Sequence, residues 1–208
     1  MLKTPRIKII ALLLPLCLIA CGPSLKKPPI EGQVLSGSEA SRVRIEVFSD
    51  LQCPACRDLF LSTLQPLMDD YQDEVSVVYY EFPLAMHKYA RPAARYVAAA
   101  AKLGPQQVLS VYKAIYNDQT YWSRDGNLDD SVSKALFAED FQKIAQIMQD
   151  ADTLAEIDQT IEKELQYVKR KGVNSTPTMF ISHGGREQKI NGKLPYQALK
   201  LFLDPAMK

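Results

Sequence analysis

Two stretches with β-strand character flank a helical repeat near the start of the folded part of the chain. Residues 43–48 and 75–82 are dense in β-branched and aromatic side chains, so both are predicted to be strands. Between them, apolar residues recur at the three-to-four spacing of an amphipathic helix, at Phe60, Leu64, Leu67 and Met68. The order strand, helix, strand predicts a βαβ unit.

The middle of the chain has helical periodicity. Pro92 suits a first helical turn, the alanine-rich run 93–101 favours helix, and Gly104-Pro105 ends one helix and starts the next. A later apolar repeat over 141–168 is broken near 150–152, which predicts two further helical segments. We interpret these apolar stripes as core.

Strand character returns after this helical block. Residues 173–181 predict a strand, Gly184-Gly185 a turn, and 189–192 a second strand. An amphipathic helix is predicted over 195–203. A βαβ unit therefore precedes the helical block, and a β-hairpin with a helix follows it.

The first twenty residues have the layout of a secretory signal. Three cations precede an uncharged apolar run at 9–20 that is short for a bilayer span. The sequence Leu18-Ile19-Ala20-Cys21 resembles a bacterial lipobox, in which the signal is removed before a cysteine that becomes lipid-modified. We therefore expect residues 1–20 to be a signal peptide and Cys21 to carry lipid. A plain secreted protein and an uncleaved membrane segment are the alternatives.

Residues 21–41 are rich in Pro, Ser, Gly and Lys and show little periodicity. They are predicted to be a flexible tether that spans about 25 Å root-mean-square. The folded domain is expected over 42–203.

Composition excludes little else. The chain has 208 residues and a formal net charge of +1 at pH 7, without a basic patch, so nucleic-acid binding is not expected. Its length allows one domain, or one domain that carries an insertion.

The export signal simplifies the cysteine count. Cys17 would leave with the signal and Cys21 would carry lipid, so only Cys53 and Cys56 remain as thiols, in an oxidising compartment. A tetrahedral zinc site usually needs four protein ligands, and His87 and His183 are the only histidines. We expect neither a metal nor an organic cofactor.

The spacing Cys53-Pro54-Ala55-Cys56 is compatible with a redox couple, half of a metal site or a structural disulfide, and its place in a βαβ unit favours the redox couple. A helix N-terminus stabilises a thiolate, so Cys53 is predicted to be the nucleophile and Cys56, one turn deeper, the resolving thiol. Pro54 fits a first helical turn. Ala55 offers the sulfur neither charge nor hydrogen bond, which predicts a thiol less acidic than in the strongest oxidants of this kind.

Thr176-Pro177 strengthens the redox interpretation. An X-Pro bond can be cis at modest cost, and a cis proline that leads into a strand exposes the preceding backbone to an extended partner chain. The alternative is an ordinary trans proline at a sheet edge.

Together these segments resemble the DsbA-like branch of the thioredoxin superfamily, an α/β class in which a helical domain is inserted into a thioredoxin-like fold. The resemblance rests on residues 48–56, on 81–84 with His87 and the Ala93-Ala94 helix, and on 176–181. It implies a helical insertion at about 90–171. It also implies that Cys53 exchanges with partners, that Cys56 closes the disulfide, and that Pro177 is cis with Thr176 beside the sulfurs.

Family members place a buried acid beneath the redox pair to relay protons, and Glu46 is the nearest candidate in this chain. The alternative is that Glu46 faces solvent on an alternating strand. His87 is remote in sequence from the cysteines, and we expect a structural or surface role for it. Trp122 and three tyrosines, Tyr112, Tyr116 and Tyr121, either pack in the core or line a client groove.

We interpret the protein as a monomeric envelope thiol–disulfide oxidoreductase, most simply an oxidase of exported client proteins. The resemblance implies a quinone-coupled membrane partner that reoxidises it. A reductase or isomerase with the same site is one alternative, and a non-catalytic thioredoxin-fold lipoprotein that acts as a chaperone or assembly factor is another. Gly22 lacks the aspartate typical of inner-membrane retention, which favours the outer membrane in a two-membrane cell. In a one-membrane cell we expect the outer face of the cytoplasmic membrane.

Overall fold

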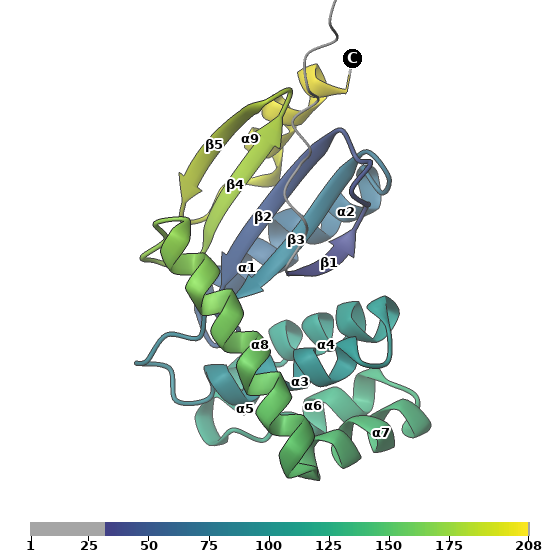
Figure 1. Ribbon diagram of the computed structural model, residues 1–208. Helices are drawn as coiled ribbons and strands as arrows, with labels where there is room; N and C mark the ends of the chain where they lie inside the picture. The colour runs from purple at the N-terminus through teal and green to yellow at the C-terminus, as the bar shows by residue number, and fades with distance from the viewer. Residues whose placement is uncertain (1–31, 208) are drawn as a thin grey trace, which may run out of the picture.

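A five-stranded mixed sheet forms the upper half of the molecule in Figure 1, and a layer of helices lies below it. The computed structural model describes residues 32–207. The predicted signal peptide, the lipobox with Cys21, and the tether up to residue 31 lie outside the described residues.

The sheet has the strand order β1-β3-β2-β4-β5. The central pair β2 and β3 is parallel, with Ser49 opposite Glu81 at the end where both strands finish, and the other neighbours are antiparallel. The strands are β1 (Gln33–Ser36), β2 (Val43–Ser49), β3 (Val75–Glu81), β4 (Thr178–His183) and β5 (Arg186–Asn191). The four strands predicted from the sequence are confirmed, with shifted boundaries in β4 and β5.

β1 corrects the sequence analysis. Residues 33–36 were predicted to belong to a flexible tether, but they pair with β3 as an antiparallel edge strand. Gly32 precedes this strand at a close approach, since a Cβ there would lie 2.3 Å from the Tyr79 carbonyl oxygen and 2.9 Å from the Tyr80 ring. The domain therefore begins about ten residues earlier than expected.

The two faces of the sheet bury different residues, because successive side chains of a strand point to opposite sides. Val43, Ile45 and Val47 of β2 belong to the main core, which also holds both cysteines. Phe48 of β2 belongs to a second cluster with residues of α8, on the other face. Odd-numbered residues of β2 therefore face the cysteines, and even-numbered residues face α8.

The helix after β2 is continuous but not uniform. It consists of α1 (Pro54–Leu59), a π-helical segment (Phe60–Leu64) and α2 (Gln65–Asp70). Pro66 has no N–H with which to continue the regular i to i−4 ladder, and the Gln65 N–H instead bonds the Phe60 carbonyl. Proline thus accounts for the widened turn.

Six helices lie between β3 and β4, which confirms the predicted helical insertion. α8 runs from the lower helical layer back to the sheet at the start of β4 (Figure 1). The helices are α3 (Ala90–Ala101), α4 (Pro105–Asn117), α5 (Gln119–Asp125), α6 (Leu128–Ala135), α7 (Ala138–Gln149) and α8 (Ala151–Arg170), and α9 (Tyr196–Leu203) follows β5.

The predicted break near residue 150 is the start of α8, where the Asp150 side chain accepts a hydrogen bond from the Thr153 N–H at 2.8 Å. α5 and α6 were not anticipated from the sequence. Within residues 32–207, none of the helices combines the length and the apolar character needed to cross a membrane.

Candidate active site

The two cysteines lie where β2 ends and α1 begins. Cys53 is the N-cap of α1, with extended backbone angles of φ −74° and ψ 121°, and Pro54 occupies the first turn. The Cys53 carbonyl accepts the first helical hydrogen bonds, from the Cys56 N–H and the Arg57 N–H, both at 3.1 Å. The backbone N–H groups of Ala55 and Cys56 at this helix start favour a negatively charged Cys53 sulfur and help to lower its pKa.

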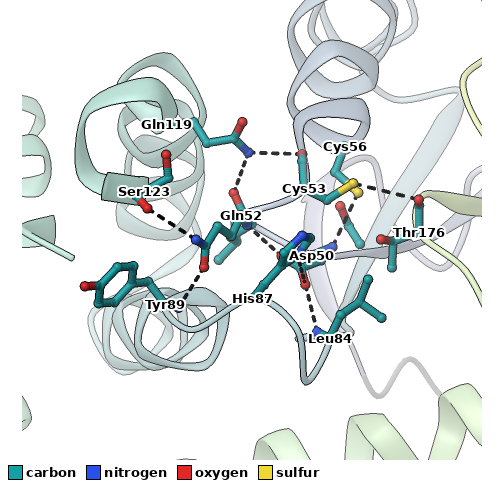
Figure 2. A network of polar contacts seen from close by, with 12 residues as sticks. Asp50, Gln52, Cys53, Cys56, Leu84, His87, Tyr89, Gln119, Ser123 and Thr176 are labelled. Carbon is teal, nitrogen blue, oxygen red and sulfur yellow. Dashed lines mark hydrogen bonds and ion pairs between the residues drawn. The ribbon is translucent and has the colours of Figure 1, made fainter. Parts of the chain in front are cut away.

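The two sulfurs have different surroundings. Cys53 retains 9% of its accessible surface, whereas Cys56 is fully buried. The Cys53 thiol lies 3.8 Å from the Thr176 carbonyl oxygen, and the Asp50 N–H donates to the Cys56 sulfur at 3.5 Å. No disulfide joins Cys53 and Cys56 in this structure, and Figure 2 shows their sulfur atoms beside the Thr176 carbonyl. Attack from outside can therefore reach Cys53 more readily than Cys56.

Their acidities differ in the same sense. A hydrogen bond from the Cys56 side chain, supported by the backbone N–H groups of Cys56 and Ala55, lowers the pKa of Cys53 to about 5 against the opposing effect of burial. Burial raises the pKa of Cys56 well above its ordinary value, and the neighbouring Cys53 adds to the rise. At neutral pH the pair is thus a thiolate at Cys53 and a thiol at Cys56.

The loop before β4 completes the surroundings of Cys53. The Thr176–Pro177 peptide bond is cis, as the resemblance implied, and the Thr176 carbonyl faces the Cys53 sulfur. The Thr178 hydroxyl donates to the Ser175 carbonyl at 2.7 Å and ties the loop down. The Thr176 hydroxyl is buried, and the Thr176 side chain helps to lower the pKa of the Cys53 thiol.

The side chains of Pro54 and Ala55 supply no polar group to the redox pair. Pro54 is exposed, and Ala55 is partly buried against the main core. The Ala55 backbone N–H helps to lower the pKa of Cys53, but its methyl group has no polar atom to offer.

His87 lies closer to the site than expected. Its Nδ1 is 2.9 Å from the Asp50 carboxylate, which also accepts from the Leu84 N–H and from the Gln52 N–H, both at 2.7 Å (Figure 2). Asp50 is fully buried and bonds Cys56 through its own N–H. The loop between β3 and α3 is therefore attached to the turn at residues 50–53, called the redox turn below. The sequence separation of 37 residues hid this contact.

Glu46 is buried, but the structure does not place it beneath the sulfurs. Its carboxylate accepts from the Tyr167 hydroxyl at 2.8 Å and the Tyr80 hydroxyl at 3.2 Å, and it lies 3.0 Å from the Lys171 ammonium. These partners belong to the α8 face of the sheet. The predicted position of Glu46 beneath the redox pair is wrong, because a shift of one residue along a strand moves a side chain to the other face of the sheet.

A buried acid does lie on the cysteine side, at the end of β3. Glu81 is fully enclosed, one of its oxygens accepts from the Tyr112 hydroxyl at 2.5 Å, and its other oxygen has no hydrogen-bond partner. Burial raises the pKa of Glu81 well above its ordinary value, and Glu164 of α8 adds to the rise. Burial raises the pKa of Tyr79 well above its ordinary value, and both Cys56 and Glu81 add to the rise. Glu81, unlike Glu46, therefore shares an environment with the redox pair.

The aromatic residues of the helical insertion are divided between core and surface. Trp122, Tyr112 and Tyr116 are buried, and the Trp122 indole donates to the Ile115 carbonyl at 2.7 Å. Tyr121 is 68% exposed. Core packing is thus the correct interpretation for three of the four, which excludes them as a client groove.

The fold and the sulfur pair together define the class of protein. The sheet with its cis-proline loop is that of thioredoxin, the helices inserted between β3 and β4 are the DsbA-like elaboration, and the unequal thiols at a helix start are suited to disulfide exchange. This class is the thioredoxin superfamily, in the form that carries an inserted helical domain and a site suited to thiol–disulfide exchange.

The chain belongs to the thioredoxin family, because a family model with that description matches residues 30–204. DsbA2 of Pseudomonas aeruginosa is similar in structure, with a TM-score of 0.65 and 25% sequence identity over 86% of this chain and 96% of that chain. Among curated protein sequences, none matches this chain significantly.

Two further solved structures share the fold at lower identity. The thiol-disulfide exchange protein alpha-DsbA2 from Wolbachia pipientis has a TM-score of 0.66 and 22% identity, covering 82% of this chain and 84% of that chain. Oxidised BdbD from Bacillus subtilis has a TM-score of 0.68 and 17% identity, covering 85% of this chain and 92% of that chain.

Proposed function

We propose that the protein is an envelope oxidase that donates the Cys53–Cys56 disulfide to thiols of exported client proteins. The single observation that carries this proposal is the inequality of the two sulfurs, with the pKa of Cys53 lowered to about 5 and that of Cys56 raised. A stabilised Cys53 thiolate favours the reduced form of the enzyme, which makes the disulfide form a better oxidant.

In the proposed reaction a client thiolate attacks the Cys53 sulfur of the oxidised pair. A client–Cys53 disulfide forms, the Cys53–Cys56 bond breaks, and the released electron pair goes to the Cys56 sulfur, which takes up a proton. A second client thiolate then attacks the client sulfur of this mixed disulfide. Cys53 leaves as a thiolate, and the client has lost two electrons to the enzyme.

The acidity of Cys53 suggests an oxidant of intermediate strength. Its pKa of about 5 lies between the values of about 7 in thioredoxin and about 3.5 in DsbA. The corresponding potentials are about −270 mV and about −120 mV. We expect this couple to fall between them, and a membrane redox partner would restore its disulfide.

The decisive experiment is equilibration of the purified protein with mixtures of reduced and oxidised glutathione, with the dithiol fraction measured by thiol alkylation. A potential more oxidising than that of thioredoxin, together with disulfide formation in a reduced client protein, supports the oxidase. Cys53→Ser and Cys56→Ser should each abolish net oxidation of the client, because neither variant can form the enzyme disulfide. In the buffer with oxidised glutathione, Cys56→Ser should form a Cys53–glutathione disulfide, and attack on its Cys53 sulfur by a client thiolate should release glutathione and leave the client trapped on Cys53.

Other results of the same experiment identify the alternatives. A potential near or below that of thioredoxin would indicate a reductase, and reshuffling of a scrambled client without net oxidation would indicate an isomerase. Full function in vivo of the double variant Cys53→Ser with Cys56→Ser would indicate a non-catalytic chaperone or assembly factor.

The proposal includes attachment to the envelope through lipid on Cys21. Its support is the sequence alone, namely the signal-like run at 9–20 and the lipobox-like residues 18–21. Radiolabelled palmitate should be incorporated into the wild-type protein and not into Cys21→Ala. A mature protein that is unlabelled and released from the cell would overturn this part of the proposal.

A further inference from the structure

The inserted helical domain contacts the backbone of the redox turn through one buried side chain. Gln119, the first residue of α5, is 2% exposed, and its amide nitrogen donates to the Leu51 carbonyl at 2.7 Å and to the Cys53 carbonyl at 3.0 Å. Figure 2 shows this amide against the turn that leads into α1. Both NH₂ protons are thus directed at the residues that set the position of the nucleophilic sulfur.

The Cys53 carbonyl occupies a special place in this turn. It is the first acceptor of α1, from the Cys56 N–H and the Arg57 N–H, and Gln119 supplies a third donor. Three donors on one carbonyl fix the Cys53–Pro54 peptide and hence the direction in which the helix amides point. The positive end of the Gln119 amide dipole also lies next to Cys53, where it favours a negatively charged sulfur.

We propose that Gln119 is a positioning residue that couples the helical insertion to the reduction potential of the Cys53–Cys56 pair. This inference rests on the proposed function. A movement of α5, such as one caused by a client bound to the helical insertion, would change the distance between the amide and the Cys53 carbonyl. The stability of the thiolate, and therefore the oxidising power, would change with it.

Gln52 provides a matched control. It is also an amide that joins the redox turn to the helical insertion, since it accepts from the Tyr89 N–H at 2.7 Å and donates to the Ser123 carbonyl at 3.4 Å. Its side chain bonds neither cysteine backbone in these contacts. A general loosening of the domain interface should therefore follow from Gln52→Met and Gln119→Met alike.

The test compares both methionine variants with the wild-type protein in glutathione redox buffers and in denaturant unfolding of the oxidised and the reduced forms. We expect Gln119→Met to lower the equilibrium constant for client oxidation about fivefold, the equivalent of one hydrogen bond, or about 20 mV toward a weaker oxidant. The pKa of Cys53 should rise. Gln52→Met should leave both quantities unchanged.

The unfolding data separate positioning from simple structural support. A purely structural residue stabilises the oxidised and reduced forms equally, so its loss leaves the potential unchanged, and that result for Gln119→Met would overturn the inference. An equal shift in both variants would overturn it as well. If Gln119→Met does not fold, Gln119→Asn retracts the amide by one methylene and gives the same comparison. A wild-type protein that fails to exchange with glutathione would instead overturn the proposed function.

Discussion

The chemistry of this protein depends on two sulfur atoms with unlike surroundings. Cys53 lies at a helix start among N–H groups, and Cys56 lies one turn deeper in the apolar core. The same separation of three residues would give two similar thiols on an exposed loop. Placement at the junction of β2 and α1 is what gives them different acidities and different roles.

The lowered pKa of Cys53 makes the stability of the reduced protein depend on pH. Above about pH 5 the folded chain holds a thiolate, whereas the unfolded chain keeps this thiol protonated up to its ordinary pKa of 9.0. The unfolded state binds the extra proton in this window. The stabilisation of the folded reduced protein by the Cys53 thiolate is therefore complete above pH 9 and is lost as the pH falls through 5.

We predict that the free energy of unfolding of the reduced form rises relative to that of the oxidised form by about 1.4 kcal/mol per pH unit between pH 5.5 and 7.5. Denaturant titrations of both forms measure the difference. The oxidised form is the internal control because its sulfurs do not titrate. Parallel pH profiles for the two forms would show that Cys53 is an ordinary thiol.

Glu46 and Glu81 offer a test of which face of the sheet serves the redox pair. We predict that Glu46→Gln leaves the pKa of Cys53 unchanged but lowers the free energy of unfolding by about 1–3 kcal/mol, since Lys171 loses one of its two carboxylate partners.

Glu81→Gln should slow disulfide exchange severalfold at neutral pH. Alkylation rates across pH and stopped-flow exchange measure the two effects, and the opposite assignment would follow if only Glu46→Gln altered exchange.

Among the inserted helices, α5 contacts the residues around the cysteines directly. It carries Gln119 at its start and is capped after Asp125 by Gly126, whose φ of +84° belongs to the left-handed region that favours glycine. A Cβ at Gly126 would lie 2.5 Å from the Tyr89 ring. The Tyr89 N–H in turn bonds Gln52 in the redox turn. The end of α5 is thus packed against the segment that leads from the site into α3.

We predict that Gly126→Ala destabilises the protein by more than Gly172→Ala does. Both positions have positive φ and would be strained by about 1–3 kcal/mol, but a Cβ at Gly172 meets nothing within 4 Å. The additional loss of stability in Gly126→Ala measures the clash of the new methyl group with the Tyr89 ring. Thermal or denaturant unfolding of the two variants gives the comparison, and equal losses would show that the Tyr89 ring moves aside at no cost.

For the whole molecule, we predict that loss of the edge strand β1 affects both the stability of the fold and its association state. β1 covers one side of β3, which is made of buried residues throughout. Removal of residues 1–36 should expose that edge, lower the free energy of unfolding and promote association through unpaired strand edges. Removal of residues 1–31 retains β1, so it should change neither the free energy of unfolding nor the association state. Size-exclusion chromatography and denaturant unfolding measure both effects, and two truncations that behave alike would make β1 dispensable.

Sequence reasoning recovered the features that are local. Strands β2 and β3, the helical insertion and the Cys53–Cys56 pair each have a signal within a short window. β1 did not, because its four residues are half polar and its partner lies some forty residues further on. Nothing local marks Gln119 or His87 either, since each acts across more than thirty residues. Glu46 was misplaced by one step of strand alternation.

The early start of the folded domain would limit where a lipid-anchored form of the protein could act. If Cys21 is held at a bilayer surface, eleven residues separate it from Gln33. A linker of that length reaches about 40 Å when fully extended and about 20 Å on average. The tether predicted over residues 21–41 would reach further. Exchange would then be confined to a shallow layer beside the lipid. Newly exported chains would have to pass through this layer while still unfolded, within easy reach of any electron acceptor embedded in the same bilayer.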